Sequence, residues 1–164
     1  MITCNVFDLQ LAVDGRKLRW QISTDLPGGT RVIVDIRRYY ENSEGEQQLW
    51  MLWSDSILLT NTGPGDFNGA AGEIDIDEGD ARGLVEFNRL LGPYSSGAVK
   101  PVGPEVHVQA TVGLRQPLKA FGKNNCNLSG DMVSEDSRGM HFVEREASAS
   151  LEMSGKFQPV QRDR

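Results

Sequence analysis

The chain has 164 residues, of which 38% are hydrophobic, and a formal net charge of −6. A chain of this length forms about one domain and buries about 70% of its unfolded surface, so it needs no disulfide or metal in order to fold. An acidic protein repels phosphate groups, which argues against general binding to nucleic acid or to an anionic membrane. We expect one domain over residues 1–155, followed by a frayed tail over 156–164 that has little apolar content.

The cysteine content and the start of the sequence indicate the compartment. Cys4 and Cys126 are the only cysteines, and no spacing typical of a disulfide framework or a zinc site occurs. The first residues lack the basic start and apolar stretch of a signal peptide, and no apolar run approaches the length of a membrane span. The sequence therefore predicts a cytoplasmic protein with free thiols and no membrane segment.

Alternating apolar residues predict strands along most of the chain, because side chains in a strand point to opposite faces in turn. Residues 5–24 predict a hairpin that turns at Asp14-Gly15. Further strands are predicted over residues 30–40, 49–59, 73–77, 105–114 and 140–153, with mostly loop at 61–72, 94–104 and 121–138. The strand at 49–59 is expected to pass Ser54-Asp55-Ser56 with a bend or bulge. A period of two places Trp50 and Trp53 on opposite faces of their strand.

One short helix is predicted near residues 80–91. Leu84, Phe87 and Leu91 recur at helical spacing, Asp80 can cap the start, and Gly92-Pro93 ends the pattern. Seven to eight short strands with turns between them favour a mostly β fold, an antiparallel two-sheet sandwich, over the rival small barrel.

Part of the chain resembles a known class of domain. The motif Thr24–Thr30, with the sequence TDLPGGT, precedes a strand that begins near Val32, and Asn68-Gly69 precedes the predicted strand at 73–77. This pattern is similar to bacterial immunoglobulin-like and fibronectin-III-like modules over about residues 16–80. The resemblance implies an immunoglobulin-like sandwich and a role in binding, spacing or assembly.

Candidate chemistry is sparse. The sequence has no Gly-x-Ser-x-Gly motif, no phosphate-binding loop and only two histidines, His107 and His141. The carboxylates of Glu73, Asp75 and Asp77 share one strand face and are weak candidates for a Ca²⁺ site, although they do not match a calcium loop. We therefore expect no catalytic residues, no cofactor and no metal.

The most concrete functional hypothesis is a non-enzymatic protein-interaction or assembly module that uses an exposed sheet face or a loop end. The contact residues are predicted to be Arg37, Tyr39, Trp53, Asn124, Asn125 and Asn127. Another protein is the expected partner, a homo-oligomer is compatible with the sequence, and nucleic acid is disfavoured. Two alternatives remain open: a small hydrolase or carbohydrate-active domain that uses the acidic cluster, and a phage- or plasmid-type inhibitor with an acidic surface.

Overall fold

The computed structural model describes residues 1–42, 44–61, 65–82 and 100–151. These residues form eleven strands, two 3-10 helices, and a helix over residues 76–82. The strands are β1 (Ile2–Thr3), β2 (Phe7–Asp14), β3 (Lys17–Thr24), β4 (Arg31–Glu41), β5 (Gln47–Leu58), β6 (Asn68–Asp75), β7 (Lys100–Pro101), β8 (Glu105–Val112), β9 (Leu128–Ser129), β10 (Ser134–Glu135) and β11 (His141–Ser150). The 3-10 helices are η1 (Lys119–Phe121) and η2 (Lys123–Asn125).

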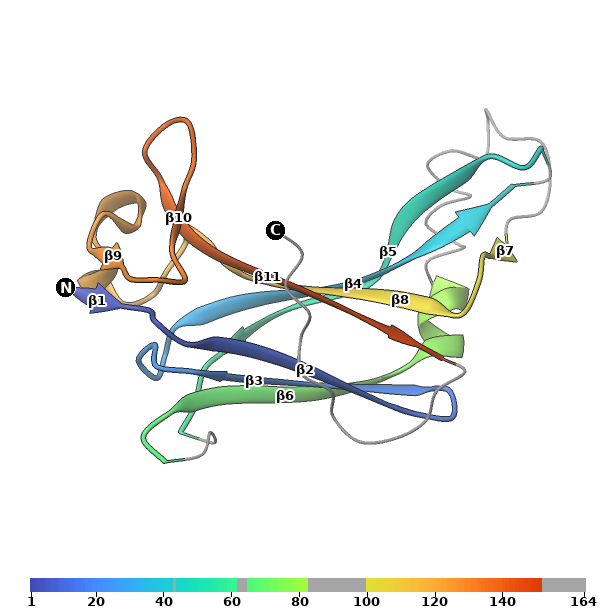
Figure 1. Ribbon diagram of the computed structural model, residues 1–164, viewed down its shortest axis with the longest axis horizontal. Helices are drawn as coiled ribbons and strands as arrows, with labels where there is room; N and C mark the ends of the chain where they lie inside the picture. Colours follow the sequence, from blue (N-terminus) through green and yellow to red (C-terminus); the bar gives the residue numbers. More distant parts are fainter. Residues whose placement is uncertain (43, 62–64, 83–99, 152–164) are drawn as a thin grey trace.

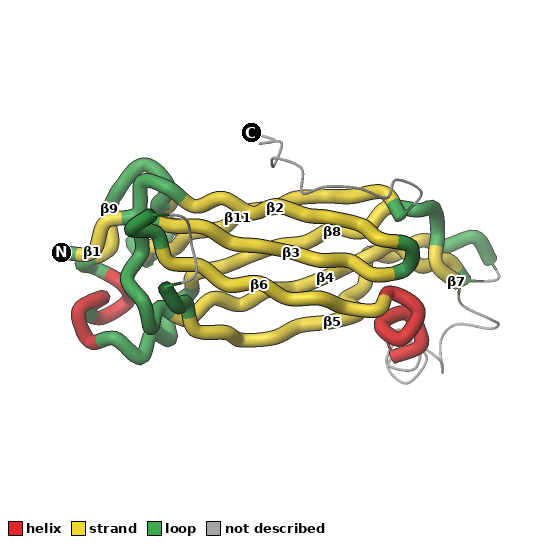
Figure 2. Tube along the Cα trace, turned by 90° about the horizontal axis from the view of Figure 1, so that it is seen from below, coloured by secondary structure: helices red, strands yellow, loops and turns green. Residues whose placement is uncertain are grey.

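Two antiparallel sheets lie in two layers (Figure 1). The small sheet has the order β2-β3-β6, and the large sheet has the order β10-β11-β8-β4-β5, with β7 also paired to β4. Figure 2 shows that the three small-sheet strands run alongside those of the large sheet, with β5 at the margin. The predicted mostly β, antiparallel architecture is confirmed, and neither sheet closes into a barrel. No helix in the described residues has the length and apolar character that crossing a membrane requires.

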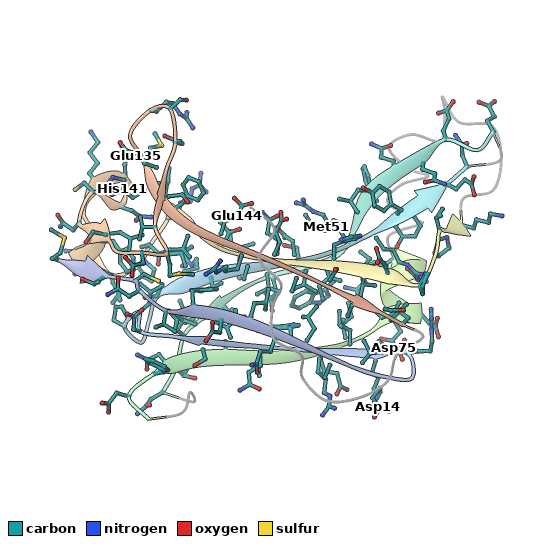
Figure 3. All side chains as sticks on the ribbon, viewed as in Figure 1. Asp14, Met51, Asp75, Glu135, His141 and Glu144 are labelled. Atoms are coloured by element: carbon teal, nitrogen blue, oxygen red, sulfur yellow. The ribbon has the colours of Figure 1, made fainter. Side chains whose placement is uncertain are left out.

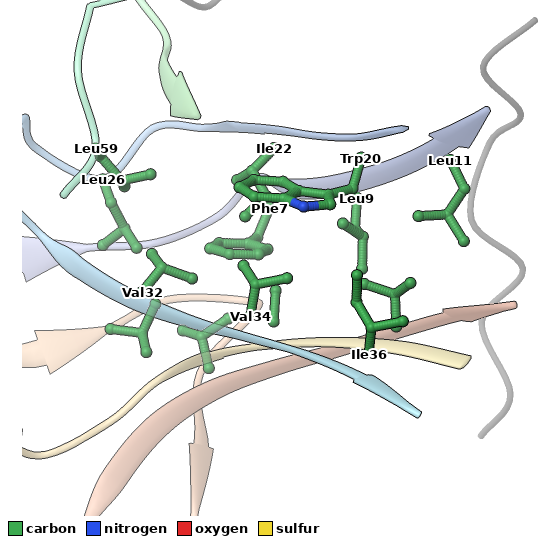
Figure 4. Packing of buried hydrophobic residues seen from close by; sticks show 14 of the residues in the cluster. Phe7, Leu9, Leu11, Trp20, Ile22, Leu26, Val32, Val34, Ile36 and Leu59 are labelled. Carbon is green, nitrogen blue, oxygen red and sulfur yellow. The ribbon is translucent and has the colours of Figure 1, made fainter. Parts of the chain in front are cut away.

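The core fills the space between the two sheets (Figure 4). The small sheet contributes alternate residues of β2 and β3, and the large sheet contributes alternate residues of β4 and β8, as the period of two predicted. These inward residues are Phe7, Leu9, Leu11, Val13, Leu18, Trp20, Ile22, Val32, Val34, Ile36, Val106, Val108, Ala110 and Val112. Burial of these side chains is the main favourable contribution to folding, at about 25 cal/mol per Å² of apolar area.

Trp20 is a fully buried residue of this core and contacts residues of both sheets. Its indole lies over Gly72, the residue directly opposite on β6, so that a Cβ at Gly72 would lie 2.4 Å from Trp20 Cζ2. The centroids of the Trp20 and Trp53 rings are 6.3 Å apart, and the two ring planes meet at an angle of 44°. Trp53 belongs to β5 of the large sheet. Trp20 therefore requires glycine beneath it and links both sheets.

A bulge in β5 overturns the prediction for the two tryptophans of that strand. Ile36 pairs with Trp53 but Arg37 pairs with Met51, which leaves Leu52 as an extra residue. The extra residue shifts the alternation by one position. Trp50, opposite the buried Arg38, therefore lies on the same face as Trp53, and the predicted placement on opposite faces is wrong.

The segment before the predicted helix also differs from the prediction. Strand β6 begins at Asn68, within the stretch predicted as loop, and ends at Asp75. The helix begins directly afterwards and covers residues 76–82, so that Asp80 lies inside it and does not cap it. The predicted helical residues Leu84, Phe87 and Leu91, like the tail 156–164, lie outside the described residues.

The Pro-Gly-Gly loop joins the two sheets where the sequence pattern resembles immunoglobulin-like modules. Gly29 has φ +88°, a left-handed conformation that favours glycine, and its N–H donates to the Leu59 carbonyl. The Asn68 side-chain amide donates to the Leu26 carbonyl, which attaches the start of β6 to the loop. The loop therefore positions β4, β5 and β6 relative to one another.

The contact between Gly72 and Trp20 leads to a test by substitution. Gly72→Ala places a methyl group against a fully buried indole that has no room to move, so we expect a loss of about 1–3 kcal/mol in the free energy of unfolding. Gly113→Ala is the control, because no atom lies within 4 Å of its Cβ position and it should change stability little. Urea denaturation of the three proteins measures both effects, and equal midpoints would contradict this account of Gly72.

Candidate functional site

The outer face of the large sheet, directed away from the small sheet, carries a cross-strand row of one basic, one apolar and one imidazole side chain. Arg37 on β4 lies between Met51 on β5 and His107 on β8, because both are its direct cross-strand partners. Direct partners share a face, and neighbouring strands lie about 4.8 Å apart, so the three side chains adjoin one another. Figure 3 shows Met51 on this outer side, together with Glu144 of β11.

Tyr39 extends this row toward the end of the strand. Its ring is 43% exposed and meets the His107 ring edge to face, with centroids 5.8 Å apart. We call Arg37, Tyr39, Met51 and His107 the contact patch. Two of the residues predicted from sequence, Arg37 and Tyr39, are thus brought together on an exposed surface.

Carboxylates adjoin the contact patch along the same face. The Asp35 carboxylate lies 3.7 Å from Arg37 Nη2 and accepts a 2.6 Å hydrogen bond from Ser54 Oγ. Two strands away, on β11, Glu146 and Glu144 are exposed on the same face, in the rows of Asp35 and Ile33. The outer face is therefore apolar and basic toward β5 and acidic toward β11.

Trp53 does not belong to this surface. The bulge directs it inward, where it packs against the core beside Trp20. The sequence pattern placed Trp53 correctly on a strand and predicted a bend or bulge at Ser54–Ser56, but the bulge lies earlier, at Leu52, and so directs Trp53 inward.

The asparagine loop lies at the end of the molecule that carries the N-terminus, beside the short strand β9 (Figure 1). Asn125 is fully buried, and its side-chain amide donates to the carbonyls of Gly113 and His141, at 2.8 and 3.1 Å. Asn127 is half-buried and donates to the Ala120 carbonyl, whereas Asn124 is exposed. Asn125 therefore holds the loop against the sheet and offers no surface to a partner.

The acidic cluster is occupied by contacts within the chain. Asp75 Oδ1 accepts from the backbone N–H groups of Asp77 and Glu78, which makes Asp75 the cap of the following helix. Glu73 lies 3.5 Å from Lys17 Nζ, and Asp77 lies 2.9 Å from Arg16 Nη2. Within the described residues, no group of three or more His, Cys, Asp or Glu side chains could hold a metal ion.

A buried charge network close to this cluster escaped the sequence analysis. The Arg38 guanidinium donates to Asp80 Oδ2 at 2.6 Å and to the Gly103 carbonyl at 2.7 Å, while the Tyr40 hydroxyl donates to Asp80 Oδ1 at 2.9 Å. One signal was present in the sequence, because Arg38 and Tyr40 continue the inward alternation of Val32, Val34 and Ile36. An arginine at an inward position requires a buried acceptor.

The surroundings of Asp80 shift two ionisation equilibria. Burial raises the pKa of the Asp80 carboxyl, while the Tyr40 hydroxyl, Arg38 and Arg16 act in the opposite direction. Burial together with the neighbouring Asp80 raises the pKa of Tyr40 far above its ordinary value, so this phenol keeps its proton and remains a donor. The network therefore attaches the helix at 76–82 to β4 through Asp80.

Removing the charge of Asp80 should reveal this structural role. Asp80→Asn leaves the buried Arg38 guanidinium without its counter-charge, and we expect a loss of about 3 kcal/mol or more in the free energy of unfolding. Asp77→Asn is the matched control, because its ion pair is exposed and contributes about 0.5 kcal/mol. Thermal and urea unfolding measure both, and similar losses for the two variants would contradict the assignment.

The two cysteines differ in their surroundings. Cys4 is fully buried, and burial raises the pKa of its thiol to about 12, whereas Cys126 is exposed on the loop after η2. Both are free thiols, as predicted. Only the thiolate is nucleophilic, so Cys4 is inert near neutral pH for two reasons, its lack of access and its protonation.

This difference predicts a stepwise thiol titration. With a disulfide reagent at about pH 8, we expect one thiol per chain to react in the native protein and the second to react only after unfolding. In Cys126→Ser the native protein should show no fast reaction at all. Two thiols that react equally fast in the native wild type would show that Cys4 is accessible.

Comparison with known proteins adds no assignment to this geometry. No family model, no curated protein and no solved structure matches the chain. The surface and the contacts described above are therefore the basis for any functional proposal.

Proposed function

We propose that the chain is a non-enzymatic interaction or assembly module that binds another protein through the contact patch. The observation that carries this proposal is where the exposed apolar side chains gather. Among the described residues seven large hydrophobic side chains are exposed, and five of them lie on β4 and β5: Ile33, Tyr39, Leu49, Met51 and Leu58. Gathering on two neighbouring strands is typical of a contact surface, since scattered apolar residues need no such explanation.

The composition of the contact patch supports a protein as the partner. Aromatic, methionine and arginine side chains are enriched at the centres of protein interfaces, and the patch contains one of each. Tyr39 presents a rigid ring, and Arg37 presents a planar donor that is only partly engaged with Asp35 at 3.7 Å. The acidic side chains at Asp35, Glu144 and Glu146 suit a partner surface with an apolar centre and a basic margin on one side.

The strand arrangement supports the finer fold assignment, an immunoglobulin-like or fibronectin-III-like sandwich. In a constant-type immunoglobulin domain seven strands divide into sheets of four and three. Here the seven strands of eight or more residues also divide so, as β5-β4-β8-β11 and β2-β3-β6. Modules of this architecture carry many unrelated functions, so the fold is compatible with the proposal but does not specify the partner.

The alternative of a hydrolase or carbohydrate-active domain gains no support from the acidic cluster. The cluster consists of Glu73, Asp75, Asp77, Glu78 and Asp80. Asp75 caps the helix, and Glu73 and Asp77 pair with Lys17 and Arg16. Asp80 is the buried member, and both of its carboxylate oxygens accept hydrogen bonds from Arg38 and Tyr40, which gives it a structural role. The interaction hypothesis needs no such site, which is why we prefer it.

Affinity capture with a matched pair of variants tests the proposal. The double substitution Arg37→Glu with Tyr39→Ala removes the centre of the contact patch. Lys123→Glu with Leu114→Ala makes the same kind of change at two exposed residues outside β4 and β5. From a lysate of the source organism, we expect the wild type and the control to retain one protein at a stoichiometric level. The patch variant should retain at most about one tenth of that amount.

Quantitative mass spectrometry of the retained proteins, after thermal unfolding has shown that all variants are folded, provides the measurement. If every protein captured by the wild type is captured equally by the patch variant, the contact patch is not the binding surface.

A further inference from the structure

Strand β2 lies at a margin of the small sheet, where it pairs with β3 alone in the described part of the chain. Its two charged residues, Asp8 and Asp14, are exposed on the outward side of the strand. Neither carboxylate forms an ion pair with another of the described residues. Natural proteins cover or charge such an edge, because open backbone groups can otherwise pair with another chain. An occupant of this edge should therefore carry basic residues at the spacing of the two carboxylates.

Strand β11 lies along the same side of the molecule in the large sheet (Figures 1 and 2). Arg145 links β11 to β2, because Arg145 Nε donates to the Phe7 carbonyl at 3.1 Å. The next inward residues of β11, Ala147 and Ala149, are small and only partly buried, and they pack against the core. The side of the sandwich between β2 and β11 therefore presents apolar surface next to the two carboxylates of β2.

The end of the sequence has the opposite charge from the chain as a whole. Residues 156–164, with the sequence KFQPVQRDR, contain three basic side chains and one acidic side chain, whereas the net charge of the chain is −6. The structure describes this end of the chain as far as Leu151, directly after β11. Strand β11 ends at the same end of the sandwich as the turn between β2 and β3 (Figure 1). The basic segment thus begins five residues beyond a point near the Asp14 end of β2.

We propose that residues 156–164 dock along the outer edge of β2 and run antiparallel to it. Length selects this direction. Leu151 and Lys156 can be at most about 18 Å apart in an extended chain, whereas Asp8 lies about 20 Å beyond Asp14 along the strand. Lys156 can therefore reach Asp14 but not Asp8, so the segment runs from the Asp14 end of β2 back toward its start.

One register brings opposite charges together at both ends of the strand. Lys156 and Arg162 are six positions apart, as are Asp8 and Asp14. With Lys156 opposite Asp14, Arg162 lies opposite Asp8 on the same outward side, because both intervals are even. Pro159 has no N–H to donate and interrupts backbone pairing, so the ion pairs define this register.

The same register suits the inward positions of the segment. It places Phe157 beside Val13, where the ring can cover the apolar surface between β2 and β11. It also places Asp163 beside Phe7, whose carbonyl accepts from Arg145, so that a carboxylate comes close to the guanidinium. Charge on the outward side, together with apolar contact and charge on the inward side, thus singles out this segment as the occupant.

This docking goes beyond the proposed function, because β2 and the contact patch belong to different sheets. A docked segment covers the backbone groups of β2 and so keeps this edge from pairing with another chain. The two proposals can fail separately. A patch variant that captures no partner would leave the docking standing, and a segment that never docks would leave the contact patch exposed.

Disulfide formation in the full chain tests the position of the segment. In a Cys126→Ser background, Gln10→Cys with Val160→Cys joins two outward positions that the register places opposite each other. Gln21→Cys with Val160→Cys is the matched control, because Gln21 is the direct neighbour of Gln10 on β3. We expect the intramolecular disulfide to form at least about tenfold faster in the first protein, since a disulfide needs Cα atoms within about 7 Å.

Non-reducing electrophoresis and mass spectrometry of timed samples measure both rates. Equal rates in the two proteins overturn the proposal. Disulfides that form between chains also overturn it, because they would show that the segment binds a second copy.

Charge reversal tests the ion pairs themselves. The rate of chymotrypsin cleavage after Phe157, relative to that of a synthetic peptide with the same sequence, reports how often the segment leaves the edge. Asp8→Lys with Asp14→Lys should speed this cleavage about fivefold or more, and so should Lys156→Glu with Arg162→Glu. All four substitutions together should return the rate to near that of the wild type, and added salt should speed cleavage of the wild type by screening.

Glu144→Lys with Glu146→Lys, on the outer face of the large sheet, is the control for net charge and should leave the rate unchanged. The restored rate distinguishes the ion pairs from a general loss of stability, because four substitutions should not repair the damage of two. A wild-type segment cleaved as fast as the free peptide overturns the proposal. So does a fourfold variant that is cleaved as fast as either half reversal.

Discussion

The close packing of the Trp20 indole on Gly72 is the contact on which the arrangement of the two sheets depends. An indole is the largest side chain in the core, and it fits here only because the residue opposite has no Cβ. The ring then reaches the large sheet, where it meets Trp53. Trp53 faces inward because of the bulge at Leu52. The bulge in the large sheet and Gly72 in the small sheet therefore both shape the space around the Trp20 indole. Packing at this point fixes the separation and register of both layers.

Local alternation predicted most strands of this fold, because a period of two is a property of consecutive residues. The larger buried residues of β2, β3, β4 and β8 follow this alternation, while Leu114, just beyond β8, is exposed. The position of the bulge in β5 and the early start of β6 were missed for a different reason. A bulge is defined by the partner strand, and Gly72 belongs to a strand because its segment pairs with β3, where Trp20 lies opposite it. Neither relation is visible within one segment.

The candidate site shows the same division between local and distant information. Arg37 and Tyr39 were predicted to be contact residues from their outward positions on one strand, and the structure places them together on an exposed face. Asn125 was predicted as a surface contact because polar residues surround it in the sequence. Its burial depends on carbonyls at Gly113 and His141, which lie 12 and 16 residues away along the chain. The partner of Arg38, Asp80, lies still further along, at a separation of 42 residues.

The parallel pairing of β1 with β9 has a consequence for the order in which the protein can be completed during synthesis. Ile2 donates to the Asn127 carbonyl, Cys4 donates to the Ser129 carbonyl, and Met132 donates back to the Cys4 carbonyl. These bonds join residues that are about 125 positions apart, so β1 lacks its partner strand β9 until the ribosome has released the chain beyond residue 129. Folding of the nascent chain can begin with the β2–β3 hairpin, whose partners are adjacent, while residues 2–4 wait. Strand β1 is thus secured later than β2 and β3, although it precedes both in the sequence.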